Sequence, residues 1–132
     1  MPVLLDTNIC IAYLNRSSAT IQKKLEELSP EEVFVSAISI AELRFGAEKS
    51  QRREANHRVL DLLISTTNMI QFDDVSATAY GELRVRLEKM GRPIGPLDTL
   101  IAAQALAFDM VLITRNEKEF RQVPSLQIES WN

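Results

Sequence analysis

The sequence predicts an α/β fold in which helices cover both faces of a central, mostly parallel sheet of four to five strands. Short apolar runs that are typical of buried strands alternate with amphipathic stretches that have helical spacing. The chain is 132 residues long and contains no internal repeat, low-complexity segment or interdomain linker, which is typical of a single domain. We therefore expect residues 1–132 to form one three-layer, helix–sheet–helix sandwich.

The first half of the chain is expected to supply two strands, each followed by helices. The apolar run Val3-Leu4-Leu5 ends at Asp6, and Thr7 and Asn8 then open a helix. Ser18 can cap the next helix. The elements expected here are a strand at 3–5, helices at about 9–14 and 18–28, a strand at 33–35 that ends at Ser36, and a helix opening at 39–42 with Leu43 and Phe45 in its apolar set.

The second half is expected to start with a long helix and then to add strands on either side of two more helices. The long helix follows a basic hinge at 49–53 and should turn Ala55, Val59, Leu62 and Leu63 inward. The other elements expected are a strand at 68–72, a helix at 75–90, a stiff loop at 91–96, an alanine-rich helix at 97–108, a strand at 111–113, a turn or short helix at 117–120 and a weak strand at 126–128.

Composition excludes several classes of protein. No apolar run approaches the length that crosses a bilayer, and the start of the chain lacks a basic region followed by an apolar one, so a cytoplasmic location is expected. The single cysteine, Cys10, has no partner for a disulfide or a zinc knuckle, and the single histidine, His57, lies in a charged stretch. Net charge is −3, although twelve of the fifteen Lys and Arg residues fall between Arg44 and Arg121.

Four acidic residues follow the predicted strands or open a helix. Asp6 ends the first strand, Glu42 lies six residues beyond the second, and Asp98 starts the alanine-rich helix. Glu119 lies five residues past Thr114, where the fourth strand is expected to end. Because the carboxyl ends of parallel strands share one edge of a sheet, these acids can converge there.

Each acid also has an explanation that requires no chemistry. Asp6 can cap the first helix, Ser39 and Glu42 match the Ser-x-x-Glu capping box, and Asp98 is favoured in a first helical turn by the macrodipole. Glu119 can be a solvated surface acid. Four carboxylates at one edge would repel each other, however, and no buried lysine or histidine is available to separate them. Oxygen ligands alone suit Mg²⁺ or Mn²⁺ better than zinc.

The chain resembles the PIN-domain ribonucleases of the VapC toxin group, from type II toxin–antitoxin systems. The resemblance covers essentially the whole chain in the right order. Its motifs are Leu5-Asp6-Thr7-Asn8, Ser39-x-x-Glu42-Leu43 with Gly46, Gly91-Arg92-Pro93-Ile94-Gly95-Pro96-Leu97-Asp98 running into Ile101-Ala102-Ala103, and Thr114-Arg115-Asn116-x-x-Glu119-Phe120 with Trp131.

The resemblance implies a PIN-domain fold and roles for the acids. By this resemblance Asp6, Glu42 and Asp98 are the core metal-binding and catalytic acids. Glu119 is the fourth such acid, with direct or water-mediated contact to the metal, at a position where many members carry Asp. Asn116 is expected to orient a ligand or a water. Thr7 and Thr114 are expected to supply hydroxyls in or next to the metal's coordination shell.

The family implies an endoribonuclease in which one or two Mg²⁺ ions, or Mn²⁺ as a substitute, activate water against an RNA phosphodiester. The loop at 91–96 is similar to that of the enterobacterial subgroup that cuts initiator tRNA in the anticodon loop. The resemblance also implies a homodimer and a VapB antitoxin whose C-terminal segment fills the acidic groove. Candidate RNA-binding residues at the rim are Arg44, Lys49, Arg92 and Arg115.

Two readings from other classes compete with this one. A phosphohydrolase of the haloacid dehalogenase type also begins with a strand that ends in Asp, but it requires a second acid two residues on, and that position is Asn8. A PIN-like module that has lost activity and only binds a partner is the second alternative. The presence of all the core acids argues against it.

Overall fold

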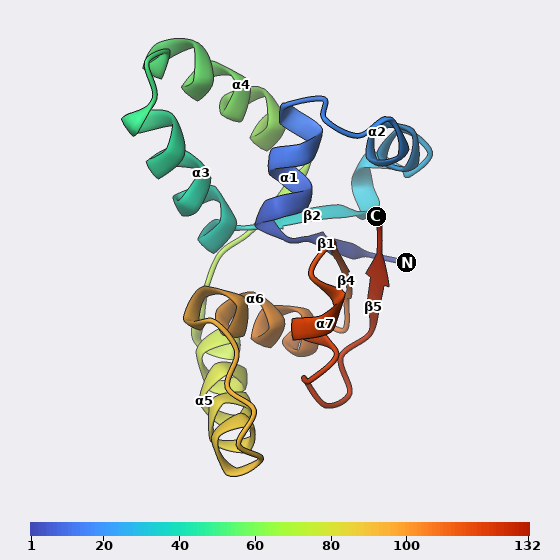
Figure 1. The fold of residues 1–132 in the computed structure, drawn as a ribbon, viewed down its shortest axis with the longest axis vertical. Coiled ribbons are helices and arrows are strands. Elements are labelled where there is room, and N and C mark those ends of the chain that lie inside the picture. Colours follow the sequence, from blue (N-terminus) through green and yellow to red (C-terminus); the bar gives the residue numbers. More distant parts are fainter.

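The computed structural model describes all 132 residues and places a sheet of five parallel strands between two layers of helices (Figure 1). The strand order is β3-β2-β1-β4-β5, and every neighbouring pair is parallel. The predicted α/β sandwich is therefore confirmed, with a fully parallel sheet. The strands are β1 (Val3–Leu5), β2 (Val33–Ser36), β3 (Asn68–Ile70), β4 (Val111–Thr114) and β5 (Ile128–Ser130).

The helices divide between the two faces of the sheet (Figure 1). One face is covered by α1 (Thr7–Leu14), α2 (Ala19–Glu26), α3 (Ala37–Lys49) and α4 (Arg53–Thr66), with a short 3₁₀ turn at Pro30–Glu32 leading into β2. The other face is covered by α5 (Asp74–Lys89), α6 (Pro96–Ala107) and α7 (Glu117–Phe120). None of these helices combines the length and the apolar composition that a membrane-spanning segment requires.

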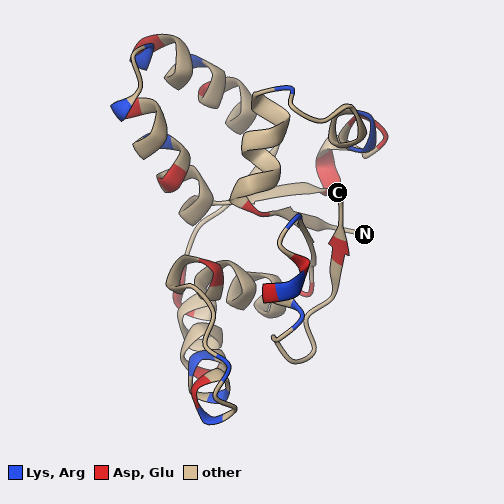
Figure 2. Ribbon diagram, in the orientation of Figure 1, with Lys and Arg blue, Asp and Glu red and all other residues tan.

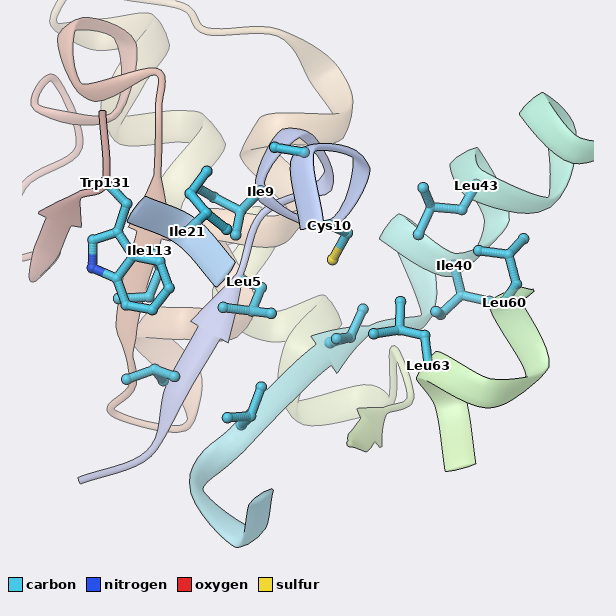
Figure 3. Packing of buried hydrophobic residues seen from close by; sticks show 14 of the residues in the cluster. Leu5, Ile9, Cys10, Ile21, Ile40, Leu43, Leu60, Leu63, Ile113 and Trp131 are labelled. Carbon is cyan, nitrogen blue, oxygen red and sulfur yellow. The ribbon is translucent and has the colours of Figure 1, made fainter. Parts of the chain in front are cut away.

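Side chains alternate along the strands and feed two separate hydrophobic clusters. Leu5 of β1 and Ile113 of β4 belong to the cluster under α1 to α4, together with Trp131 (Figure 3). Leu4 and Leu112, the alternate residues, belong to the cluster under α5 to α7. Because both faces of β1 and β4 are covered, these strands consist entirely of apolar residues up to their last position.

The face that α4 buries differs from the predicted one. Leu60 and Leu63 are buried, but Leu62 is 65 % exposed and Val59 is 44 % exposed. α4 packs chiefly against α3, and its buried residues Leu60 and Leu63 belong to the same hydrophobic cluster as Ile40 and Leu43 of α3. Phe45 on α3 was also expected to be inward and is 65 % exposed.

The outer strands differ from the prediction at their ends. β3 stops at Ile70 rather than residue 72, and β5 begins at Ile128, two residues later than expected. Leu126 still belongs to the preceding turn, because its N–H bonds the carbonyl of Val123 and Ser125 has a positive φ of 64°. Register with β4 then places Ile128 opposite Leu112.

Candidate active site

The order of the strands reverses between β1 and β4, and two of the predicted site residues lie at that reversal. From β1 the sheet continues through β2 to β3 on one side, whereas β4 and β5 lie on the other. Asp6 directly follows β1, and Thr114 is the last residue of β4. In open parallel sheets, ligands bind in the crevice outside the carboxyl ends of the strands at such a switch point.

Asp6 is buried and hydrogen-bonded through both carboxylate oxygens. Its side chain is 3 % exposed. One oxygen accepts from the backbone N–H of Ile9 at 2.8 Å and caps α1. The prediction that Asp6 can cap the first helix is therefore confirmed. The other accepts from the hydroxyl of Thr114. Burial raises the pKa of Asp6, the nearby charge of Glu42 adds to the rise, and the hydrogen bonds oppose it.

Glu42 lies in the second turn of α3 and reaches back to α1. Its Oε1 atom is 2.7 Å from the hydroxyl of Thr7, which in turn is 2.9 Å from the hydroxyl of Ser39. The predicted capping box of Ser39 and Glu42 is wrong, because α3 already begins at Ala37 and Ser39 therefore lies inside the helix. Ser36, at the end of β2, caps it by accepting from the N–H of Ile38 at 3.0 Å. Glu42 is therefore free of a capping role.

Asp98 is the third residue of α6, after Pro96 in the first turn. It is half-buried and its carboxyl pKa is raised to about 7. Burial is the largest cause, followed by the charge of Glu119 and a hydrogen bond with it, and then by the charges of Asp6 and Glu42. The charges of all three other acids therefore act on Asp98.

Glu119 is held by N–H donors on both sides. Its Oε1 atom accepts from the backbone N–H of Gly95 at 2.7 Å, and its Oε2 atom accepts from the side-chain amide of Asn116 at 2.5 Å. A Cβ added at Gly95 would lie 3.5 Å from Oε1 of Glu119 and 3.6 Å from Oδ2 of Asp98. Glu119 thus links α7 to the loop before α6, at the point where Asp98 is positioned.

Asn116 connects the Asp6 and Glu119 sides of the site. Its backbone N–H donates to the hydroxyl of Thr114 at 2.8 Å, and Thr114 donates to Asp6. Its side chain donates to Glu119. Asn116 therefore contributes no charge and instead fixes the orientation of two acid-bearing groups.

The four carboxylates lack any cationic partner in the protein. Each ion pair of the molecule involves other groups, and none includes Asp6, Glu42, Asp98 or Glu119. Carboxylate oxygens with hydroxyl groups beside them are the donor set that Mg²⁺ and Mn²⁺ prefer. The residues present therefore fit such an ion chemically. As the side chains stand, no three acidic side chains are grouped closely enough to hold one metal ion. Asp6, Glu42 and Glu119 each accept hydrogen bonds within the protein.

The four basic residues predicted at the rim fall into two groups. The first group makes contacts within α3 and α4. The guanidinium of Arg44 is hydrogen-bonded to Asp61 at 2.6 Å and to the ring and carbonyl of His57, all on α4. Lys49 lies over the exposed ring of Phe45. Arg92 and Arg115 are exposed and form no ion pair. Figure 2 shows basic residues on α7 and around the far end of α5, outside the acidic centre.

Sequence reasoning missed two buried polar residues beside the site, Ser36 and Gln104. Ser36 was expected only as the end of a strand, and Gln104 was included in a helix described as apolar nearly all round. Both side chains are completely buried, and they are hydrogen-bonded to each other. The available signal was Gln104 itself, a lone polar residue in the run from Ile101 to Ala107.

The chain matches a known protein family along almost all of its length. The family described as "PIN domain" matches residues 3–126. The Rickettsia felis protein "Ribonuclease VapC2" is 39 % identical over 133 residues, which cover 100 % of this chain and 99 % of that protein. The Shigella flexneri protein "tRNA(fMet)-specific endonuclease VapC" is 35 % identical over 129 residues, covering 98 % of this chain and 97 % of its own.

The chain is also similar in fold to chains of solved VapBC structures. The crystal structure of DNA-bound VapBC from Salmonella typhimurium contains a chain that superposes with a TM-score of 0.94 at 33 % identity, covering 100 % of this chain and 99 % of that one. A chain of VapBC2 from Rickettsia felis, bound to a promoter DNA fragment, gives a TM-score of 0.93 at 38 % identity and complete coverage of both chains.

The raised pKa of Asp98 predicts how stability depends on pH in the metal-free protein. Between about pH 4 and pH 7 the folded state holds a proton that the unfolded state has released. The free energy of unfolding therefore falls as pH rises through this range, by on the order of 1–2 kcal/mol after allowance for solvent screening. Urea unfolding in EDTA at pH 5 and pH 8 measures this. Asp98→Asn removes the titration and should flatten the pH dependence; an unchanged slope in that variant would contradict the raised pKa.

Proposed function

The chain belongs to the PIN-domain family and, within it, to the VapC ribonucleases, and on that premise we propose that it is a Mg²⁺-dependent endoribonuclease and the toxin of a VapBC toxin–antitoxin pair. The observation that carries the proposal is the group of four carboxylates at the β1–β4 switch point with no cationic side chain among them. Neighbouring carboxylates disfavour each other's ionised form, and a bound cation would offset that repulsion.

We assign Asp6, Glu42 and Asp98 as the residues that would hold Mg²⁺, or Mn²⁺ in its place. The chemistry that such an ion supplies is to lower the pKa of water and to neutralise charge growing on the scissile phosphate. Glu119 has both oxygens occupied by N–H donors, so its contribution to the metal site includes holding the Gly95 loop and, with it, the start of α6.

The other residues of the site maintain this arrangement during the reaction. Thr114 and the N–H of Ile9 hold the Asp6 carboxylate in place, and Thr7 does so for Glu42. No protein nucleophile is required, and none is at hand: Cys10 is completely buried, and burial raises the pKa of its thiol far above neutral. Hydrolysis by water would leave a 5′-phosphate and a 3′-hydroxyl.

We propose structured RNA, with initiator tRNA first, as the substrate. The support is the name of the Shigella flexneri relative, a tRNA(fMet)-specific endonuclease, and the chain's own loop at 91–96. Metal-free carboxylates repel RNA phosphates, so metal and RNA binding should be coupled. The exposed Arg92 and Arg115 are the better candidates for phosphate contact, because Arg44 is already occupied by α4.

We propose a VapB-type antitoxin as the partner that silences the enzyme. Solved neighbours are VapBC complexes, and the chain offers a largely apolar groove between α1, α3 and α4 that runs to Glu42. Ile11, Leu43 and Val59 are among the groove's lining residues. A VapB segment seated there would reach the acidic centre. Phe45 on α3 and Leu62 on α4 are exposed apolar side chains, and they support a homodimer contact.

Neutralising one acid should abolish cleavage without unfolding the protein. Asp98→Asn and Asp6→Asn keep the size of each side chain but remove charge from the cluster, and we expect RNA cleavage and toxicity to fall by at least about a hundredfold. Asp109→Asn is the matched control, because Asp109 follows the opposite end of the same helix, is exposed and has a φ of 52° that Asn tolerates. Circular dichroism would check folding. Cleavage at the wild-type rate by purified Asp98→Asn would refute the metal-site assignment.

Cleavage should depend on a divalent cation. We expect EDTA to stop the reaction, added Mg²⁺ or Mn²⁺ to restore it, and Ca²⁺ to restore it poorly because its coordination is larger and looser. The measurement is cleavage of a labelled tRNA at fixed ionic strength. Activity that persists in EDTA would point to a metal-independent ribonuclease.

The experiment that tests the whole proposal is to express the chain in cells and map which RNAs acquire new 5′ ends. We expect new 5′-phosphate ends in the anticodon loop of initiator tRNA, their absence with Asp98→Asn, and their suppression when the cognate VapB is co-expressed. New ends in another structured RNA would refute the tRNA assignment alone. No new ends at all would favour the alternative of an inactive partner-binding module.

A further inference from the structure

Gln104 is a fully buried polar residue in the middle of α6, the helix that carries Asp98. Its side chain is 0 % exposed, as are its neighbours Ile101, Ala102 and Ala103. Both ends of its amide are used: the oxygen accepts from the hydroxyl of Ser36, and the nitrogen donates to the backbone carbonyl of Gln71 at 3.2 Å. Gln104 therefore joins α6 to the ends of β2 and β3.

Ser36 extends this connection to α3, the helix that carries Glu42. It is the last residue of β2, is itself completely buried, and accepts the N–H of Ile38 at 3.0 Å as the N-cap of α3. The Ser36 hydroxyl thus caps α3 and also donates a hydrogen bond to Gln104 of α6. Ser39, in the first turn of α3, is hydrogen-bonded to Thr7 of α1.

Packing alone does not explain a glutamine at this position. Burial of an amide costs free energy that its hydrogen bonds only just offset, so leucine, which is similar in volume, would fill the same space at least as well. What a hydrogen-bonded amide adds is direction, because its bonds fix both the distance and the orientation of the groups that they join. Here one of those groups is Ser36, the N-cap of the helix that carries Glu42, and Gln104 itself lies on the helix that carries Asp98.

We propose that Gln104 is a positioning residue for the metal site: through Ser36 it sets the placement of α6 relative to α3, and hence of Asp98 relative to Glu42. The inference rests on the proposed function. Mg²⁺ and Mn²⁺ tolerate little deviation from octahedral geometry, so a small displacement of one acid-bearing helix weakens binding. Residues that orient metal ligands from behind commonly change metal affinity by about 10- to 100-fold.

Gln104→Leu breaks the link while it keeps the volume of the side chain. We expect the dissociation constant for Mn²⁺, measured by titration calorimetry without RNA, to rise by about tenfold. The Mn²⁺ concentration for half-maximal cleavage should rise in parallel, while the KM for RNA at saturating Mn²⁺ stays unchanged. Ser36→Ala, a smaller change that removes the same bond from the other side, serves as the second variant if Gln104→Leu does not fold.

Gln22→Leu is the matched control. It is the same substitution of a glutamine whose amide donates to a backbone carbonyl, that of Tyr13 at 2.6 Å, but it lies on α2, away from the acids. Stability of every variant is measured by urea unfolding. We expect Gln22→Leu to lose stability without losing Mn²⁺ affinity. The double variant Ser36→Ala/Gln104→Leu should bind Mn²⁺ no worse than the weaker of the two single variants, since both remove the Ser36–Gln104 hydrogen bond.

Wild-type Mn²⁺ affinity in folded Gln104→Leu, or in folded Ser36→Ala, would overturn the inference and leave the proposed function intact. An equal loss of affinity in Gln22→Leu would also overturn it, because the effect would then follow general stability. Failure of the wild-type protein to bind Mn²⁺ would instead refute the proposed function, and the positioning role would fall with it.

Discussion

Repulsion among four carboxylates at one edge of a parallel sheet is the constraint that the rest of this structure accommodates. Parallel pairing brings the ends of β1, β2 and β4 to the same edge, so Asp6, Glu42 and Glu119, which follow these strands, are directed to one side of the sheet. The consequence is visible in Asp98, where burial and the neighbouring charges together raise the pKa to about 7. No lysine or arginine forms an ion pair with any of these four acids, and this is why we propose that a cation binds among them.

Hydrogen bonds within the protein hold three of the four acids. Asp6 is held by Thr114 and by the start of α1, Glu42 by Thr7, and Glu119 by Gly95 and Asn116. Each bond connects an acid to a segment that carries another site residue. The first turn of α3 is central to this network, because Ser36 reaches α6 and Ser39 reaches α1. Glu42, which follows them on α3, is itself hydrogen-bonded to Thr7 of α1.

The sequence predicted the layers, the strands and the order of the acids, because all of these depend on local patterns. Short apolar runs marked β1, β2 and β4 within one residue, and the acids beyond them were found by their spacing. The prediction placed the start of α3 too late. The helix begins directly after β2, so the last residue of that strand, Ser36, is the N-cap in place of Ser39. The buried partner of Gln104 lies 68 residues away, which no periodicity in α6 could reveal.

The central claim is that Asp6, Glu42 and Asp98 together bind one divalent cation. Its most direct measurement is anomalous X-ray diffraction from crystals of the protein grown with Mn²⁺, recorded at the manganese absorption edge. We expect an anomalous peak among these three carboxylates, at the carboxyl end of β1, and no such peak in crystals of Asp98→Asn. Crystals that bind Mn²⁺ only elsewhere, or not at all, with the three carboxylates turned away from one another, would contradict it.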